Sequence, residues 1–123
     1  MIHDIILAKE VLEEGLLKYE DALERSSYKY DESILDDLWG VTIALPSIRH
    51  NNKALGRCFY KEKRLEVYPH EKHTKPQFID TVLHELAHHI SYIMFGRDGI
   101  GHSKRWKETC RIIGASDNMY GLQ

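Results

Sequence analysis

The sequence has little cysteine and proline and no long apolar run. Its two cysteines, Cys58 and Cys110, lie 52 positions apart without a CxxC pair. They cannot form a zinc ribbon, and we expect both thiols to be free and buried. No apolar stretch approaches the roughly 20 residues that a membrane-spanning helix needs, so we expect no membrane partner. The amino-terminal residues lack the basic segment of a secretory signal, which favours a cytoplasmic protein.

Repeats, low-complexity tracts and Pro/Gly linkers are also missing, so residues 1–123 are expected to form one domain. The net charge of −2 is unevenly distributed. Residues 1–40 contain 4 Lys/Arg and 11 Asp/Glu, whereas residues 41–123 contain 13 and 8. The weak basic excess of residues 41–123 is compatible with a solvated surface and with a nucleic-acid interface, and it is more typical of the former.

The sequence has helical periodicity on both sides of a central segment, whose composition favours strands instead. Residues 4–26 place apolar side chains at three- and four-residue steps, with Gly15 as a local weakness. A short helix is expected over 32–39, capped by Asp31. Another helix is predicted from Pro76 to Phe95, ending at Gly96, and a last one over 103–113, ending at Gly114.

The segment between these helices predicts three short strands, because it is rich in β-branched and alternating residues. The strands are expected in "GVTIALP" (40–46), "ALGRCFYK" (54–61) and "KRLEVYP" (63–69). Lys61 to Lys63 are few enough to form a hairpin turn between the last two. The order of elements predicts an α+β fold: an amino-terminal helix, a small three-stranded sheet, a long helix and a carboxy-terminal helix.

The long helix carries His84-Glu85-Leu86-Ala87-His88, an HExxH motif. His84 and His88 are four residues apart, so both imidazoles project from one helix face and can bind one ion. At about 100° per residue the apolar face lies opposite, which predicts that the two histidines point away from the core. Glu85 lies beside the ligand axis, where a base can reach a metal-bound water. The pattern indicates metal-assisted hydrolysis.

A catalytic zinc ion normally takes three protein ligands and keeps one position open. The longer motif HExxHxxGxxH is absent, since Ser91 and Met94 occupy its last two defined positions. Two candidates follow. His102 comes after 13 intervening residues, on a glycine-flanked loop at the start of a helix, and Glu108 lies one helix further on. We favour His102, with Glu108 as the alternative.

The segments "VLHELAHHI" and "GHSKRWKETCRIIG" resemble the SprT-like metalloprotease domain, which is related to the Spartan proteases that act on DNA–protein crosslinks. "ALGRCFYKEKRLEVYP" resembles the strand pair that precedes the active-site helix in that family, and the resemblance covers about residues 30–115. It implies a zincin-like fold, one Zn²⁺ held by His84, His88 and His102, and Glu85 as catalytic base.

The sequence departs from the family pattern at two points. Ser103 stands where a glycine usually follows the third histidine. Serine can cap the helix instead. The zinc ribbon that follows the domain in many relatives is missing, so we expect a minimal form. DNA as a partner is implied by the resemblance alone, and nothing indicates the oligomeric state.

We therefore expect a zinc-dependent endopeptidase that acts on a protein or peptide, with Glu85 as general base for a metal-activated water. The alternative is a zinc-containing module that binds DNA or protein without turnover. Glu85 argues against that alternative, because pure binding needs no base beside the water.

Several neighbouring residues have weaker indications. His89 is expected to be structural, and Trp106 to belong to the core. Asp80 is interpreted either as a carboxylate that orients a ligand imidazole or as an acid that favours the helix dipole. Tyr92 and Tyr120 are candidate oxyanion stabilisers. His70 and His73 either line the cleft or belong to an exposed loop, and His3 and His50 carry no signal.

Overall fold

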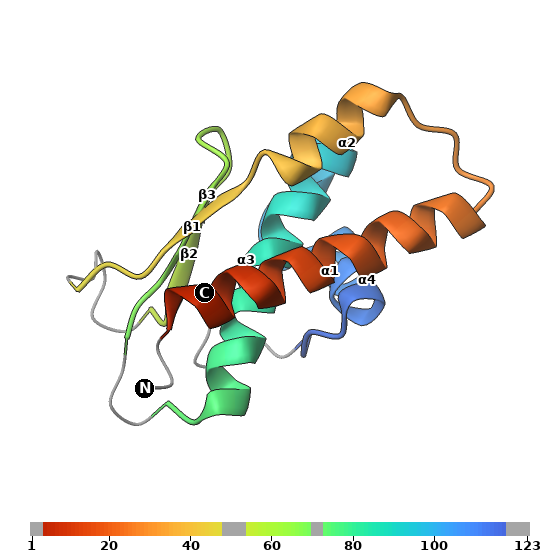
Figure 1. The fold of residues 1–123 in the computed structure, drawn as a ribbon. Helices are drawn as coiled ribbons and strands as arrows, with labels where there is room; N and C mark the ends of the chain where they lie inside the picture. Colours follow the sequence, from red (N-terminus) through yellow and green to blue (C-terminus); the bar gives the residue numbers. More distant parts are fainter. Residues whose placement is uncertain (1–3, 48–53, 70–72, 118–123) are drawn as a thin grey trace.

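The computed structural model describes residues 4–47, 54–69 and 73–117. The elements follow the predicted order (Figure 1). They are α1 (Ile5–Arg25), α2 (Glu32–Trp39), β1 (Thr42–Ala44), β2 (Gly56–Phe59), β3 (Arg64–Val67), α3 (Lys75–Phe95), the 3₁₀ turn η1 (Gly96–Gly99) and α4 (Lys104–Ile113). This confirms the predicted α+β class and is consistent with a minimal zincin-like fold.

The helix ends follow the local signals in the sequence. The side chain of Asp31 accepts a hydrogen bond from the backbone N–H of Ser33 and caps α2 as predicted. Helix α3 begins one residue before the predicted Pro76, behind a capping box formed by Thr74 and Gln77. The turn η1 was not predicted, because the residues after Gly96 read simply as a loop.

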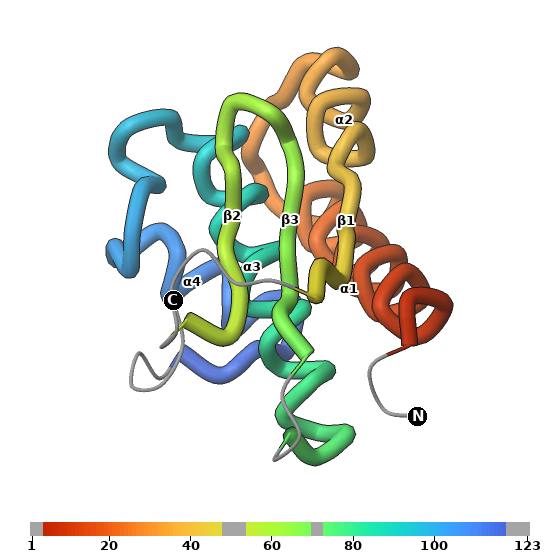
Figure 2. The backbone as a smooth tube through the Cα atoms, turned by 90° about the vertical axis from the view of Figure 1, so that its left-hand side faces the viewer, coloured from red at the N-terminus to blue at the C-terminus, as the bar shows by residue number. Residues whose placement is uncertain are grey.

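The three strands form one mixed sheet in the order β1-β3-β2. Strands β2 and β3 are antiparallel and joined by the predicted hairpin turn, whereas β1 pairs parallel to β3. Figure 2 shows the sheet in front of α3, with β2 at one edge. Leu65 in the central strand is aligned with Ile43 on one side and Cys58 on the other. The edge strand β2 therefore lies beside the helix that carries the HExxH motif.

Helix α3 is enclosed by the other elements, and every side chain from Thr81 to Ser91 is buried. His84 is 0% exposed and His88 is 5% exposed. The sequence predicted only that these two histidines point away from the apolar core, and it did not indicate that they would be buried. The helical wheel identified one apolar face correctly, but the sheet and α4 also cover the polar face of the helix.

Gly15 in α1 is a point of close packing and not merely a weakness of the helix. The glycine is buried, and a Cβ atom there would lie 2.7 Å from Cδ2 of Leu86 and 3.1 Å from Cδ2 of Leu83. The absence of a side chain lets α1 approach α3 closely. Sequence periodicity shows only the cost of glycine within α1, because the compensating contact lies on another helix.

Gly99 brings the chain back onto α3 after the helix has ended. A Cβ atom at this position would overlap the backbone carbonyl group of Ser91 and lie 2.8 Å from its Oγ atom. The contact joins the backbone of Gly99 to the backbone of Ser91, so neither segment can easily move aside. The chain is thus held against α3 at Ser91, three residues beyond His88, before it continues to His102.

No helix among the described residues has the length and apolarity needed to cross a membrane.

Substitution of Gly99 tests this close approach. We expect Gly99→Ala to lower the free energy of unfolding by about 3 kcal/mol, because the added methyl group meets immobile helix backbone. The matched control is Gly114→Ala, where an added Cβ would meet only Nζ of Lys18, at 3.7 Å, but φ is 86°, in the left-handed region. That control should lose only about 1 kcal/mol to backbone strain. Urea unfolding of both variants measures the difference, and equal losses would contradict the packing.

Candidate metal centre

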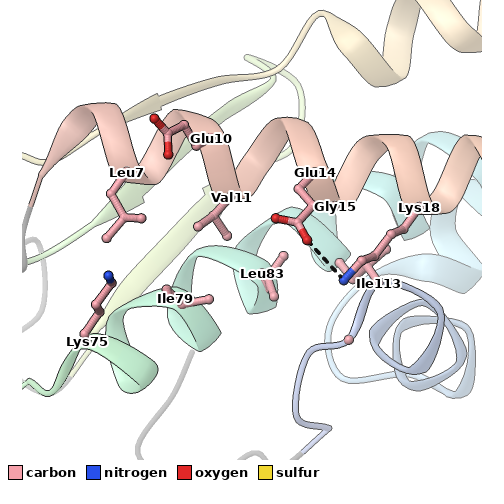
Figure 3. Close-up of a pocket in the computed structure, with 11 residues that line it drawn as sticks. Leu7, Glu10, Val11, Glu14, Gly15, Lys18, Lys75, Ile79, Leu83 and Ile113 are labelled. Carbon is pink, nitrogen blue, oxygen red and sulfur yellow. Dashed lines mark ion pairs between the residues drawn. The ribbon is translucent and has the colours of Figure 1, made fainter.

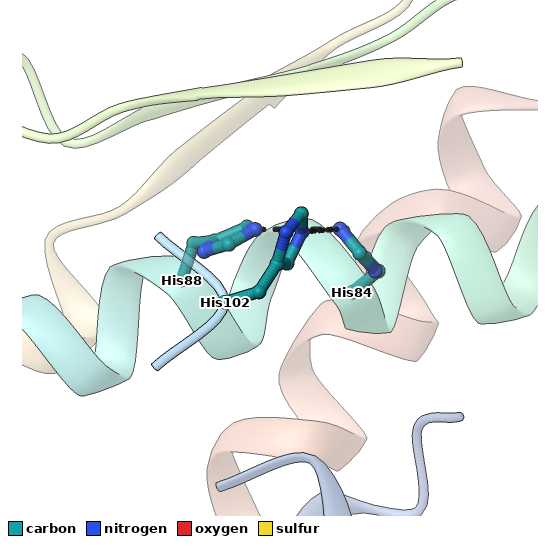
Figure 4. A group of neighbouring side chains, drawn as sticks. All are labelled: His84, His88 and His102. Atoms are coloured by element: carbon teal, nitrogen blue, oxygen red, sulfur yellow. Dashed lines mark hydrogen bonds between the residues drawn. The ribbon is translucent and has the colours of Figure 1, made fainter. Parts of the chain in front are cut away.

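The three histidines predicted as metal ligands come together in the fold (Figure 4). His84 and His88 project from successive turns of α3, and His102 reaches them from the loop between η1 and α4. The Nε2 atoms of His88 and His102 each lie 3.3 Å from Nε2 of His84. One ligand atom from each residue lies within 4.8 Å of the others. This group can hold a metal ion.

Local geometry delivers His102 to this position. Gly101 adopts a φ of 70°, in the left-handed region that favours glycine, and turns the chain immediately before the histidine. Ser103 then caps α4, its side chain accepting a hydrogen bond from the backbone N–H of Trp106. The serine thus takes the capping role that the sequence suggested. Burial, followed by the nearby Lys107 charge, lowers the pKa of His102, which favours the neutral imidazole that a metal requires.

Trp106 forms one wall of the histidine group. Its side chain is fully buried, as predicted, and its ring centre lies 4.9, 5.2 and 4.5 Å from those of His84, His88 and His102, respectively. The indole N–H also donates to the backbone carbonyl of His84 at 3.4 Å. One side chain from α4 therefore packs against all three imidazoles and restricts their rotation.

Glu85 is buried beside the histidines. Its Oε2 atom lies 4.0 Å from Nε2 of His84 and accepts no hydrogen bond from any described residue. Burial raises the pKa of this carboxyl group well above its usual value. The backbone of β2 covers it at Gly56, where a Cβ atom would lie 2.9 Å from both Cγ and Oε2 of Glu85. A buried carboxylate oxygen without a protein donor is suited to a bound water or a reacting group.

Tyr60 is a neighbour of the site that sequence reasoning missed. Its hydroxyl oxygen lies 3.4 Å from Nδ1 of His88 and accepts a hydrogen bond from the backbone N–H of Gly101 at 3.1 Å. Burial raises the pKa of the phenol. The only signal in the sequence was its place at the end of the strand that leads into the hairpin.

These groups surround a small pocket of about 210 Å³ between β2, α3 and the His102 loop. Its lining contains a base, two imidazoles, a phenol, a guanidinium and a thiol: Glu85, His88, His102, Tyr60, Arg57 and Cys58, together with Gly101. Cys58 is only partly buried there, contrary to expectation, because its strand forms the edge of the sheet. Both thiols are free, and Cys110 is buried as predicted.

The alternative third ligand, Glu108, lies outside the histidine group. It is partly exposed on α4, and its Oε2 atom is 3.6 Å from Nη1 of Arg105. His89 is buried on another face of α3, and its Nε2 atom lies 3.0 Å from the carbonyl oxygen of Leu38. It therefore joins α3 to α2, which agrees with the structural role expected for it.

Asp80 and Tyr92 have contacts that the sequence did not indicate. The Asp80 carboxylate accepts a hydrogen bond from the backbone N–H of Ser116 at 2.7 Å, so it holds the segment that follows α4. Tyr92 packs against Tyr60 with ring centres 4.9 Å apart and is not among the residues that line the pocket.

Of the remaining candidates the structure describes His73 alone. His73 is 7% exposed, contrary to the expected exposed loop, and it does not line the pocket. His3, His50, His70 and Tyr120 lie outside the described residues.

A second hollow, of about 410 Å³, lies on the α1 side of α3 (Figure 3). Leu7 and Val11 face Ile79 and Leu83 across it, and the ion pair between Glu14 and Lys18 lies at its edge. The described residues that line it include no histidine or cysteine. We therefore place the chemistry of the protein in the smaller pocket beside the three imidazoles.

No curated protein and no solved structure matches the chain significantly. The model of the SprT-like family, in contrast, matches residues 19–121, which include the histidine group, Glu85 and the β2–β3 hairpin. With most of its length matched, and as its motifs had indicated, the chain belongs to the SprT-like family.

Proposed function

We propose that this protein is a zinc-dependent endopeptidase in which His84, His88 and His102 hold one Zn²⁺ and Glu85 is the general base. The main support for this proposal is that three Nε2 atoms lie close together beside the buried carboxylate of Glu85. Membership of the SprT-like family supports a metalloprotease-type domain with zinc as its metal. Peptide hydrolysis needs the elements assembled here, namely an ion with an open position and a nearby base.

The residues fit a zinc ion. Nitrogen ligands about 2.0–2.1 Å from a tetrahedral zinc ion lie about 3.3–3.4 Å from one another. The two Nε2–Nε2 distances to His84 are both 3.3 Å. Three imidazoles leave one tetrahedral position for water or substrate, which is the composition of a catalytic rather than a structural site. The Oε2 atom of Glu85, which no described donor satisfies, lies next to this group.

Glu85 would transfer the proton in the reaction. A bound zinc ion would supply a Lewis acid that polarises the peptide carbonyl and lowers the pKa of water to about 7. The Glu85 carboxylate takes one proton from the attacking water as the new C–O bond forms. It then gives that proton to the amide nitrogen as the C–N bond breaks. The burial that raises the pKa of Glu85 helps it to retain the proton between these steps.

The edge strand β2 would bind the substrate. Among the described residues it pairs only with β3, and its residues Arg57 and Cys58 line the pocket. An extended peptide can add to such an edge through backbone hydrogen bonds, which favours unfolded or flexible protein segments of varied sequence. The family resemblance extends the proposal to DNA-associated proteins as substrates.

Loss of the third ligand should weaken metal binding selectively. We expect His102→Ala to lower zinc affinity at least about 100-fold, because it removes one of three protein ligands. Glu108→Ala, a control on helix α4 that follows His102, should bind zinc as the wild type does, since Glu108 pairs with Arg105 outside the histidine group. Competition with a chromophoric chelator measures both affinities. If only Glu108→Ala reduces affinity, the ligand assignment is wrong.

Removal of the base should separate binding from catalysis. Glu85→Gln keeps the shape of the side chain but cannot accept the proton, so we expect peptidase activity to fall at least about 100-fold with zinc still bound. The assay is cleavage of an unfolded protein by zinc-loaded enzyme, with metal content measured in parallel. Cleavage by the variant at the wild-type rate would contradict the mechanism.

The same assay distinguishes the endopeptidase from a zinc-containing binding module. We expect a chelator to abolish cleavage by the wild type and single-stranded DNA to increase it. Zinc-loaded wild type that binds protein or DNA without cleaving any substrate would instead favour the module. Cleavage that is unaffected by DNA would retain the protease and reject DNA as its activator.

A further inference from the structure

We propose that Tyr60 is a positioning residue that joins the second and third zinc ligands, His88 and His102, through one hydroxyl group. The inference rests on the zinc site proposed above and extends it to a side chain outside the histidine motif. Its basis is a pair of contacts to the same oxygen atom: Nδ1 of His88 at 3.4 Å and the backbone N–H of Gly101 at 3.1 Å. Gly101 immediately precedes His102 in the chain.

The direction of these hydrogen bonds follows from metal binding. The Nε2 atom of His88 faces the other two histidines, so the metal would bind there and the ring proton would reside on Nδ1. Nδ1–H then donates to the phenol oxygen. The backbone N–H of Gly101 is a donor as well, and it donates to the same oxygen, which has two lone pairs. The Tyr60 oxygen would therefore accept both bonds, one from a ligand imidazole and one from the loop that carries the other ligand.

Tyr60 is itself held in place by β2 and α3. Its backbone carbonyl accepts a hydrogen bond from the N–H of Lys63 across the hairpin turn at 3.3 Å. Its ring packs against Tyr92, with ring centres 4.9 Å apart, and lies edge-on to His88. The hydroxyl group is thus fixed by elements that do not include the His102 loop. It serves as a reference point from which both ligands are oriented.

Two hydrogen bonds are described for the backbone N–H groups of the loop between Gly99 and His102. Gly101 has a φ of 70° and nothing within 4 Å of the position of a Cβ atom. Beyond Gly99, the hydrogen bonds described for the backbone N–H groups of Ile100 and Gly101 go to Arg97 within η1 and to Tyr60. The Tyr60 contact is the one of these two that connects the loop to the sheet. Removing the hydroxyl group should therefore affect both ligands together.

The test is the zinc affinity of Tyr60→Phe, measured by competition with a chromophoric chelator. This variant keeps the ring that packs against Tyr92 and loses only the hydroxyl group. We expect affinity to fall about 10-fold to 100-fold, as is typical when a hydrogen-bond partner of a metal ligand is removed. The matched control Tyr92→Phe should bind zinc within about twofold of the wild type, because the phenol of Tyr92 does not line the pocket. The absorption spectrum of the cobalt-loaded Tyr60→Phe variant should also change.

A coupling measurement separates positioning from general destabilisation. In a His102→Ala background, Tyr60→Phe should cost clearly less zinc affinity than in the wild type, since one of the two ligands it positions is gone. An equal cost in both backgrounds would overturn the joining role. Unchanged affinity and an unchanged cobalt spectrum in the single variant would overturn the proposal entirely.

A measurement on the unaltered protein covers the case in which Tyr60→Phe does not fold. In zinc-loaded wild type, nuclear magnetic resonance should detect a slowly exchanging proton on Nδ1 of His88 and a protected amide proton on Gly101. Rapid exchange of both would overturn the proposal. If the wild type fails to bind zinc at all, the proposed function fails with it, whereas tight zinc binding with an unaffected variant rejects Tyr60 alone.

Discussion

Close packing around helix α3 is the constraint on which the rest of the structure depends. Three glycines on three different elements touch this helix: Gly15 of α1 at Leu86, Gly56 of β2 at Glu85, and Gly99 of η1 at Ser91. At each position a methyl group would collide with the helix or its side chains. The neighbouring elements can therefore approach α3 more closely than side chains would permit. At Gly56 this approach brings the backbone of β2 against Glu85, which lines the pocket beside the histidines.

A buried helix with polar side chains must supply each of them with a partner, because an unsatisfied polar group costs free energy in the interior. His89 meets the carbonyl of Leu38 in α2, and the indole of Trp106 donates to the carbonyl of His84. The Oε2 atom of Glu85 has no hydrogen-bond partner among the described residues, and neither have Nδ1 of His89 and Oγ of Ser91 on the same helix. Of these three residues Glu85 alone lines the pocket beside the histidines, where its carboxylate oxygen is available to the general base role that we propose for it.

The sequence predicted what depends on neighbours along the chain. Helix caps and the spacing of residues on one helix are local properties of this kind. The structure has the caps at Asp31 and Ser103 and brings His84 and His88 together. Long-range contacts were less accessible. The parallel pairing of β1 with β3, the enclosure of the histidines and the packing of Gly15 against Leu86 each join distant segments. Tyr60 was missed for the same reason, since its partners follow it by 28 and 41 positions.

The separation of His102 from His84 and His88 along the chain has a thermodynamic consequence. The third imidazole arrives only after the chain has left the helix, turned through η1 and returned, so the histidine group does not exist in an unfolded chain. An ion held by all three imidazoles binds the folded state alone and acts as a cross-link between α3 and the start of α4. Its binding free energy adds to the folding free energy. Occupancy of the centre and persistence of the fold thereby become one linked equilibrium, set by the concentration of free metal.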